Sequence, residues 1–267
     1  MEPFYYLEVF ANNCIIEITV NGLFLARSDA KNGSSLNYPF NTELIGKGNT
    51  VSITAIPTLL DSGAISLFSD VVINGALKKY QPGDITGPES GEIIAAIDFE
   101  EVKSEKSKDV TGLAALAALF PLQKSYVFDN ETLDFKNRLV DAPVISDKEK
   151  LFDYGIFLRN LLERQDLNGL CKEFEPKLKD YGITYPNDLP DPIKWFKDFM
   201  TTDFFPGGPI TGFSRDAIGL RSWCDGKIWE LFIKPTTQFF SNRGDDGDIN
   251  SIEIFVGLVD DQLKIIR

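Results

Sequence analysis

The chain has 267 residues, of which 43% are hydrophobic and 25% charged, and its 27 basic and 40 acidic residues give a net charge of −13. This length and composition fit one large domain or two small ones. The charge disfavours nucleic acids and anionic membranes as partners, because binding to both needs an excess of Lys and Arg. A basic protein partner is favoured instead.

Histidine is absent from the sequence. This removes the commonest general base and transition-metal ligand, and it excludes Ser-His-Asp and Cys-His catalysis. An enzyme would have to use Asp, Glu or Tyr as acid and base, or a metal held by oxygen ligands. The sequence has no Walker loop, Rossmann fingerprint or Cys/His metal spacing. We therefore expect no catalytic residue, no metal and no cofactor, and a binding protein is favoured over an enzyme.

The N-terminal sequence MEPFYYLEVF has no basic region before an apolar segment, so no signal peptide is predicted. The apolar segment 113–122 has about half of the ~20 residues that a spanning helix needs, so no membrane span is predicted. Three cysteines far apart in the chain indicate free, buried thiols. We expect a cytoplasmic protein, or a periplasmic or secreted one if a signal peptide has been removed.

Residues 1–102 are expected to form an antiparallel β-sandwich. Apolar and polar residues alternate from Cys14 to Val20, and Asn21-Gly22 favours a hairpin turn into residues 23–27. Further strand patterns cover residues 50–56, 64–75 and 92–102, a spacing typical of sandwiches. The rhythm of strands and turns resembles that of jelly-roll and carbohydrate-binding sandwiches. Aromatic residues interpreted as core, or alternatively as a sugar-stacking platform, are Phe4, Tyr5, Tyr6, Phe24, Tyr38, Phe40 and Phe68.

Residues 103–145 are expected to be a linker and connecting segment. Residues 100–109 are rich in both charges, which is typical of a solvated loop. Residues 126–144 show only a weak extended pattern.

Residues 146–267 are predicted to form an α+β domain with three helices followed by strands. Ser146 and Glu149 have the spacing of a capping box before the first helix. The second helical pattern begins at Asp166 and is expected to break or kink at Pro176. The third begins at Asp191, with proline at the first helical position.

From residue 217 onward apolar residues alternate with polar ones again. Asp225-Gly226 and Asp260-Asp261 favour hairpin turns between the strands. The whole chain is therefore predicted to be α+β, a sandwich followed by helices on an antiparallel sheet.

The element order over residues 146–267 resembles the NTF2-like, cone-shaped superfamily. The segments LLERQDLNGLCKEFEPKL and IEIFVGLVDDQLKIIR carry the resemblance. It implies a curved antiparallel sheet with helices on its concave side, a fold shared by ketosteroid-isomerase-like enzymes, ligand-binding domains and non-enzymatic partner domains. Such a fold can enclose a ligand pocket between the helices and the sheet, or the aromatic residues there can fill the core instead. The candidate pocket residues are Tyr154, Trp195, Arg221, Trp223 and Trp229.

An acidic segment lies within residues 239–255. It resembles the start of a calcium loop, but Ser251 and Gly257 stand where an EF-hand needs Gly and Glu, so the tip of a hairpin is preferred. Carboxylates at such a tip would attract a basic partner. The candidate partner-binding residues are Asp245, Asp246 and Asp248.

These observations together favour a non-enzymatic, acidic protein-binding module. In composition the chain resembles immunity and inhibitor proteins that neutralise a basic partner. Two alternatives stay open. One is an NTF2-like pocket protein that binds, isomerises or hydrolyses a small molecule, and the other is a carbohydrate-binding sandwich with an accessory domain.

Overall fold

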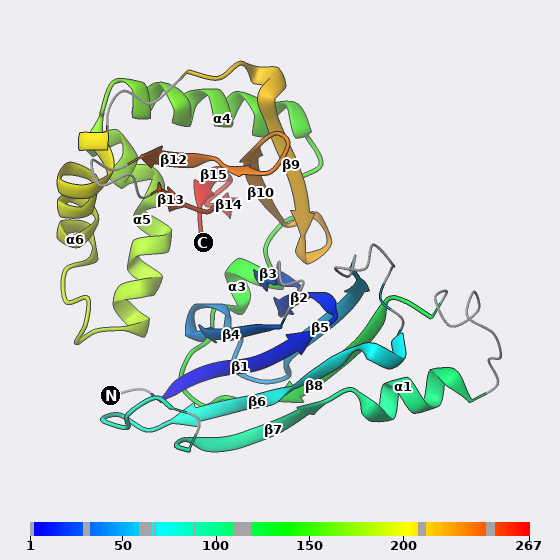
Figure 1. Ribbon diagram of the computed structural model, residues 1–267. Helices are drawn as coiled ribbons and strands as arrows, with labels where there is room; N and C mark the ends of the chain where they lie inside the picture. The colour runs from blue at the N-terminus through cyan, green and yellow to red at the C-terminus, as the bar shows by residue number, and fades with distance from the viewer. Residues whose placement is uncertain are drawn as a thin grey trace. The chain divides into compact units, whose positions relative to one another are not determined.

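The computed structural model describes residues 3–28, 33–58, 66, 68–87, 89–108, 119–207, 212–243 and 249–267 (Figure 1). The chain divides into two compact units, residues 1–135 and 136–267. Antiparallel sheets occur in both units together with helices, so the predicted α+β class is confirmed. Most of the apolar segment 113–122 and all three candidate aspartates, Asp245, Asp246 and Asp248, lie outside the described residues.

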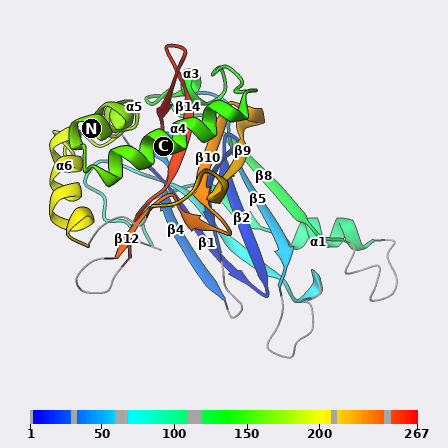
Figure 2. The same ribbon diagram turned by 90° about the horizontal axis from the view of Figure 1, so that it is seen from above.

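The first unit contains two antiparallel sheets, with strand orders β4-β1-β6-β7 and β3-β2-β5-β8. Figure 2 shows strands of both sheets running alongside one another. The strands and the helix of the first unit are β1 (Phe4–Asn12), β2 (Cys14–Val20), β3 (Leu23–Arg27), β4 (Ser34–Pro39), β5 (Asn49–Pro57), β6 (Val72–Tyr80), β7 (Glu92–Asp98), α1 (Glu100–Ser107) and β8 (Leu122–Phe128). Two short 3-10 turns, η1 (Asn41–Glu43) and η2 (Phe68–Asp70), lie between them.

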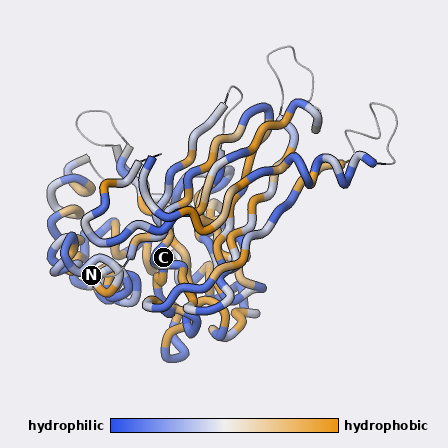
Figure 3. The backbone as a smooth tube through the Cα atoms, turned by 90° about the horizontal axis from the view of Figure 1, so that it is seen from below, coloured by the Kyte–Doolittle hydropathy of each residue, from blue (hydrophilic) through white to orange (hydrophobic). Residues whose placement is uncertain are grey.

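Both sheets of the first unit bury apolar side chains, among them Leu7 of β1 and Ile18 of β2. Buried and less buried side chains alternate along β1 and β2. Figure 3 shows hydrophobic and hydrophilic residues interspersed along the strands. Tyr5 of β1 stacks on Phe128 at the end of β8, with ring centroids 5.7 Å apart, so aromatic contacts join the sheets. Burial of this apolar surface, at roughly 25 cal/mol per Å², is the main force that holds them together.

Parts of the predicted connecting segment differ from a linker. Residues 100–107 form helix α1 and not a loop, because Glu100 and Glu101 at its start and Lys106 in its last turn suit the helix dipole. Residues 122–128 form β8, which pairs with β5 over its whole length. The segment 103–145 is therefore not a linker throughout.

The second unit has three main helices followed by an antiparallel sheet of order β11-β10-β14-β15, with β9 beside β10 and a separate β12-β13 pair. The helical elements are α3 (Lys136–Leu139), α4 (Lys148–Glu163), α5 (Leu167–Thr184), α6 (Pro192–Phe199), η3 (Met200–Phe204), η4 (Phe205–Gly207), η5 (Arg215–Ala217) and η6 (Cys224–Gly226). The strands are β9 (Ile218–Trp223), β10 (Ile228–Ile233), β11 (Thr237–Gln238), β12 (Phe240–Arg243), β13 (Ile249–Ile252), β14 (Ile254–Val259) and β15 (Gln262–Ile265).

An aspartate caps each main helix. The Asp166 and Asp191 carboxylates accept a hydrogen bond from a first-turn backbone N–H, both at 2.9 Å. The predicted cap at Ser146 is wrong by one residue, because the Asp147 carboxylate accepts the N–H groups of Glu149 and Lys150. Such caps satisfy donors that the helix itself leaves free.

Of the break or kink predicted at Pro176, the break is wrong, because helix α5 runs through this residue. Proline removes one backbone hydrogen bond and crowds the preceding turn. The helix continues because Phe174 and Leu178, on either side of the proline, are buried in the core. Their packing outweighs the local cost.

The predicted turns of the second unit are confirmed. Asp225 and Gly226 have φ angles of 55° and 84°, and Asp260 and Asp261 have φ angles of 51° and 60°. Strands β12 and β13, which flank residues 244–248, pair antiparallel as the hairpin interpretation requires.

The three cysteines are free thiols. Cys14 is buried, and Cys171 and Cys224 are half-buried. Burial raises the pKa of Cys14 and Cys224 to about 12, so both thiols stay protonated at neutral pH.

Candidate functional site

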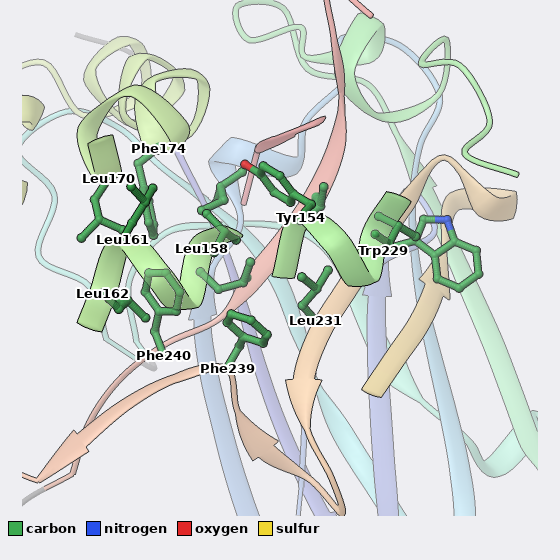
Figure 4. Packing of buried hydrophobic residues seen from close by; sticks show 14 of the residues in the cluster. Tyr154, Leu158, Leu161, Leu162, Leu170, Phe174, Trp229, Leu231, Phe239 and Phe240 are labelled. Carbon is green, nitrogen blue, oxygen red and sulfur yellow. The ribbon is translucent and has the colours of Figure 1, made fainter. Parts of the chain in front are cut away.

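The space between α4 and the sheet, where the NTF2-like resemblance implies a pocket, is filled by side chains (Figure 4). Helix α4 lies close to the strands, since a Cβ added to Gly155 would stand 2.9 Å from Ile218 Cδ1. Two of the five candidate pocket residues, Tyr154 and Trp229, belong to this core and are 9% and 7% exposed.

Tyr154 takes part in a polar contact at the edge of the core. Its hydroxyl donates to Glu173 Oε2 at 2.7 Å, and Lys264 Nζ donates to Glu173 Oε1 at 3.0 Å. Burial and the Glu173 carboxylate raise the pKa of Tyr154 well above its usual range. The phenol therefore stays protonated at neutral pH, and the contact joins α4, α5 and β15.

Tyr154 also borders a surface hollow of about 540 Å³ whose rim includes Asp147 and Asp153. Both carboxylates already have protein partners. Asp147 caps α4, and Asp153 Oδ1 lies 2.9 Å from Arg215 Nη2. Asp261 also lines the hollow, and what argues against Tyr154 as a general base is its contact with Glu173, which keeps the phenol protonated.

Arg221 and Trp223 lie on the other face of the sheet. Leu220 packs against the core, and alternation along β9 places Arg221 and Trp223 on the opposite face. Arg221 Nη1 and Trp223 Nε1 approach the same oxygen, Glu230 Oε2, at 3.2 and 3.1 Å. The guanidinium also lies 5.4 Å from the Phe232 ring centroid, a cation–π contact. The structure therefore separates this pair from Tyr154 and Trp229.

Trp195, the fifth candidate, lies in an apolar groove between α5, α6 and β13. We call this surface the aromatic groove. It encloses about 360 Å³, and its apolar walls include Phe174, Tyr181, Trp195, Phe196, Phe199 and Ile252.

The exposed wall of the aromatic groove is a stacked pair of rings. Trp195 and Phe199 lie one helical turn apart on α6, with centroids 5.8 Å apart and planes 8° apart. Half of the Trp195 surface is exposed to solvent. Phe196 of α6 and Met200, the first residue of η3, are buried in the core, so this helical segment has two apolar sides. The spacing of these four residues indicates a helix with two apolar sides, but it does not show which side faces solvent.

One end of the aromatic groove is polar. Lys177 Nζ donates to the backbone oxygen of Glu253 at 3.4 Å and lies over the rings of Phe174 and Tyr181. Glu253 is exposed as a whole residue, and partial desolvation of its carboxyl, together with the neighbouring Glu230, raises its pKa. Within the described part of the chain, no Lys or Arg forms an ion pair with Glu253. A cation brought by a ligand would be stabilised there.

Other kinds of site find no support among residues that the structure describes. The described residues contain no group of three or more Cys, Asp or Glu side chains that could hold a metal ion. No helix among them has the length and apolar character needed to cross a membrane. In comparisons with known proteins, no family model, no curated protein and no solved structure matches this chain.

Proposed function

We propose that the chain is a non-enzymatic protein-binding module whose aromatic groove holds a peptide segment of a basic partner. The observation that carries this proposal is the half-exposed Trp195 stacked on Phe199 above an apolar floor. Binding surfaces concentrate their free energy in such aromatic residues, which bury a large area when a partner covers them.

The charge of the chain supports a basic partner. The net charge of −13 accelerates encounter with a cationic protein and makes association sensitive to salt. At the groove itself, Glu253 offers a carboxylate beside the apolar walls. The segment that fits this surface has an aromatic or aliphatic side chain next to a Lys or Arg.

This proposal includes an inhibitor-type role, in which the module covers a functional surface of its partner, and an NTF2-like fold for the second unit. The order of α4, α5 and α6 before an antiparallel sheet supports that fold. The free thiols support a cytoplasmic location.

Trp195→Ala is expected to weaken peptide binding by roughly 30-fold or more, because the loss of an aromatic hot spot costs about 2 kcal/mol or more. Peptides selected from a random phage-displayed library on the wild-type protein provide the probe, and isothermal titration gives their affinities. Phe157→Ala is the matched control, since it also removes a partly exposed ring, 44% exposed, from outside the groove.

Glu253→Gln separates charge from apolar contact in the same experiment. The peptide cation lowers the raised pKa of Glu253 on binding, so the affinity rises as the pH increases through that pKa and falls below it. Glu230 and Lys177 are the other charged groups that act on this carboxyl. The Gln variant should lose this pH dependence. Failure to recover any peptide, or equal affinity for wild type and Trp195→Ala, would contradict the proposal.

A further inference from the structure

The first unit carries a second groove on the outer face of the sheet β4-β1-β6-β7. We call it the polar groove. It encloses about 400 Å³ and lies over strands β4, β1 and β6, with residues 86 and 87 of the following loop as one wall. Side chains along it are Tyr6, Glu8, Phe10, Ser35, Asn37 and Asn74.

A buried network fixes one side of the polar groove. Lys78 Nζ lies 2.8 Å from Glu8 Oε2 and donates to the Gly87 backbone oxygen at 3.1 Å. The Tyr80 hydroxyl lies 2.9 Å from Glu8 Oε1. Lys78 and Tyr80 are only 3% and 1% exposed, whereas the Glu8 side chain keeps 20% of its surface exposed. The carboxylate is thus held in place on the groove before any ligand arrives, which reduces the entropy lost on binding.

Two exposed amides also line the polar groove, Asn37 on β4 and Asn74 on β6. Asn37 pairs in register with Glu8, and Asn74 pairs in register with Phe10. Neither amide side chain is hydrogen-bonded to another protein group among the residues that the structure describes. Neighbouring strands lie roughly 4.8 Å apart and alternate residues roughly 7 Å apart, so these polar groups span an area close to that of one or two sugar rings.

We propose that the polar groove binds a neutral saccharide. An amide presents both a donor and an acceptor, and a carboxylate presents acceptors, the combination that sugar hydroxyl groups need. The Tyr6 and Phe10 rings offer apolar surface for the C–H face of a sugar ring. This site goes beyond the proposed protein-binding function and lies in the other unit.

Charge argues for a neutral ligand rather than an anionic one. Residues 1–135 contain 9 Lys and Arg but 18 Asp and Glu. The ammonium of Lys78 is already paired with Glu8. An anion would therefore meet net repulsion and no available cation on the groove.

The aromatic residues that the sequence offers as a sugar-stacking platform coincide only in part with the residues that line the polar groove. Tyr5 and Phe40 are buried in the sandwich core, at 2% and 0% exposure. Tyr6, one of the residues of that predicted platform, lines the polar groove. Phe10, which was not part of the predicted platform, lines it as well. Alternation along β1 explains both placements, since Tyr6 and Phe10 share the face opposite to Tyr5.

The test uses the full chain and isothermal titration with neutral tetrasaccharides of glucose, xylose, mannose, galactose and N-acetylglucosamine, with a sulfated heparin tetrasaccharide as the anionic probe. At least one neutral probe should bind. Asn37→Ala and Asn74→Ala should each weaken it roughly three- to tenfold, the usual effect of one lost hydrogen bond. Phe10→Ala should weaken it to a similar extent.

Tyr38→Ala is the control, because Tyr38 lies on β4 beside Asn37, is 38% exposed like Phe10, and does not line the groove. It should bind as wild type does. No binding of any neutral probe would overturn the proposal. Equal affinity in the Asn37, Asn74 and Phe10 variants, or a preference for the sulfated probe, would overturn it as well.

Discussion

Asp180→Ala is expected to lower the free energy of unfolding of the second unit by about 3–5 kcal/mol, the usual cost of removing one partner from a buried ion pair. Asp180 is 1% exposed on α5. Its carboxylate lies 2.6 Å from Arg267 Nη1 and 3.1 Å from Arg138 Nη2. Without it, the Arg267 side chain, 4% exposed, would keep its charge in the interior with its carboxylate partner gone.

Urea unfolding followed by tryptophan fluorescence measures this effect, because all three tryptophans lie in the second unit. Glu175→Ala is the control on the same helix. Glu175 forms an exposed ion pair with Lys179 at 2.7 Å, and its loss should cost at most about 0.5 kcal/mol. A loss for Asp180→Ala no larger than that for the control would show that the buried network contributes little.

Gly75→Ala is expected to destabilise the first unit by about 3 kcal/mol or more, because an added side chain combines backbone strain with a steric clash. Gly75 has a φ of +157° on β6. A Cβ there would stand 2.0 Å from the backbone oxygen of Glu8 and 2.9 Å from Val9 Cα. Strands β1 and β6 would have to separate, and the polar groove that lies over them would change shape.

Hydrogen exchange followed by mass spectrometry shows where this destabilisation acts. The variant should lose protection in peptides from β1 and β6, while the second unit keeps its protection. Gly48→Ala controls for backbone conformation alone, since Gly48 has a φ of +69° and nothing lies within 4 Å of an added Cβ. That control should cost about 1 kcal/mol. Equal losses of stability in Gly75→Ala and Gly48→Ala would mean that the close approach of β1 and β6 contributes little to the stability of the first unit.

Short-range features of this fold were predictable from the sequence because they depend on neighbouring residues. Asn21-Gly22 and Asp225-Gly226 form the expected turns, since asparagine, aspartate and glycine tolerate positive φ. The aspartate that caps α6 is likewise determined by a few adjacent residues. By contrast, Pro176 lies inside α5, where tertiary packing overrides the local preference.

The candidate sites were harder to predict because periodicity shows which residues share a face, but not what covers that face. Alternation places Arg221 and Trp223 on one face of β9, but the sequence alone does not show that the core lies on the other face. Trp195 was assigned to an internal pocket although it is half-exposed. The polar groove depends on Glu8 of β1 meeting Lys78 and Tyr80 of β6, residues far from it in the sequence, so no local pattern predicts it.

The most direct test of the proposed binding site is fluorine NMR of the protein labelled with 5-fluorotryptophan. The three tryptophans report on three places: Trp195 on the aromatic groove, Trp223 on the other face of the sheet and Trp229 on the core. Addition of a selected peptide should shift or broaden the Trp195 resonance and leave the other two in place. A Trp195 resonance unchanged at saturating peptide, with a shift at Trp223 or Trp229, would contradict binding in the aromatic groove.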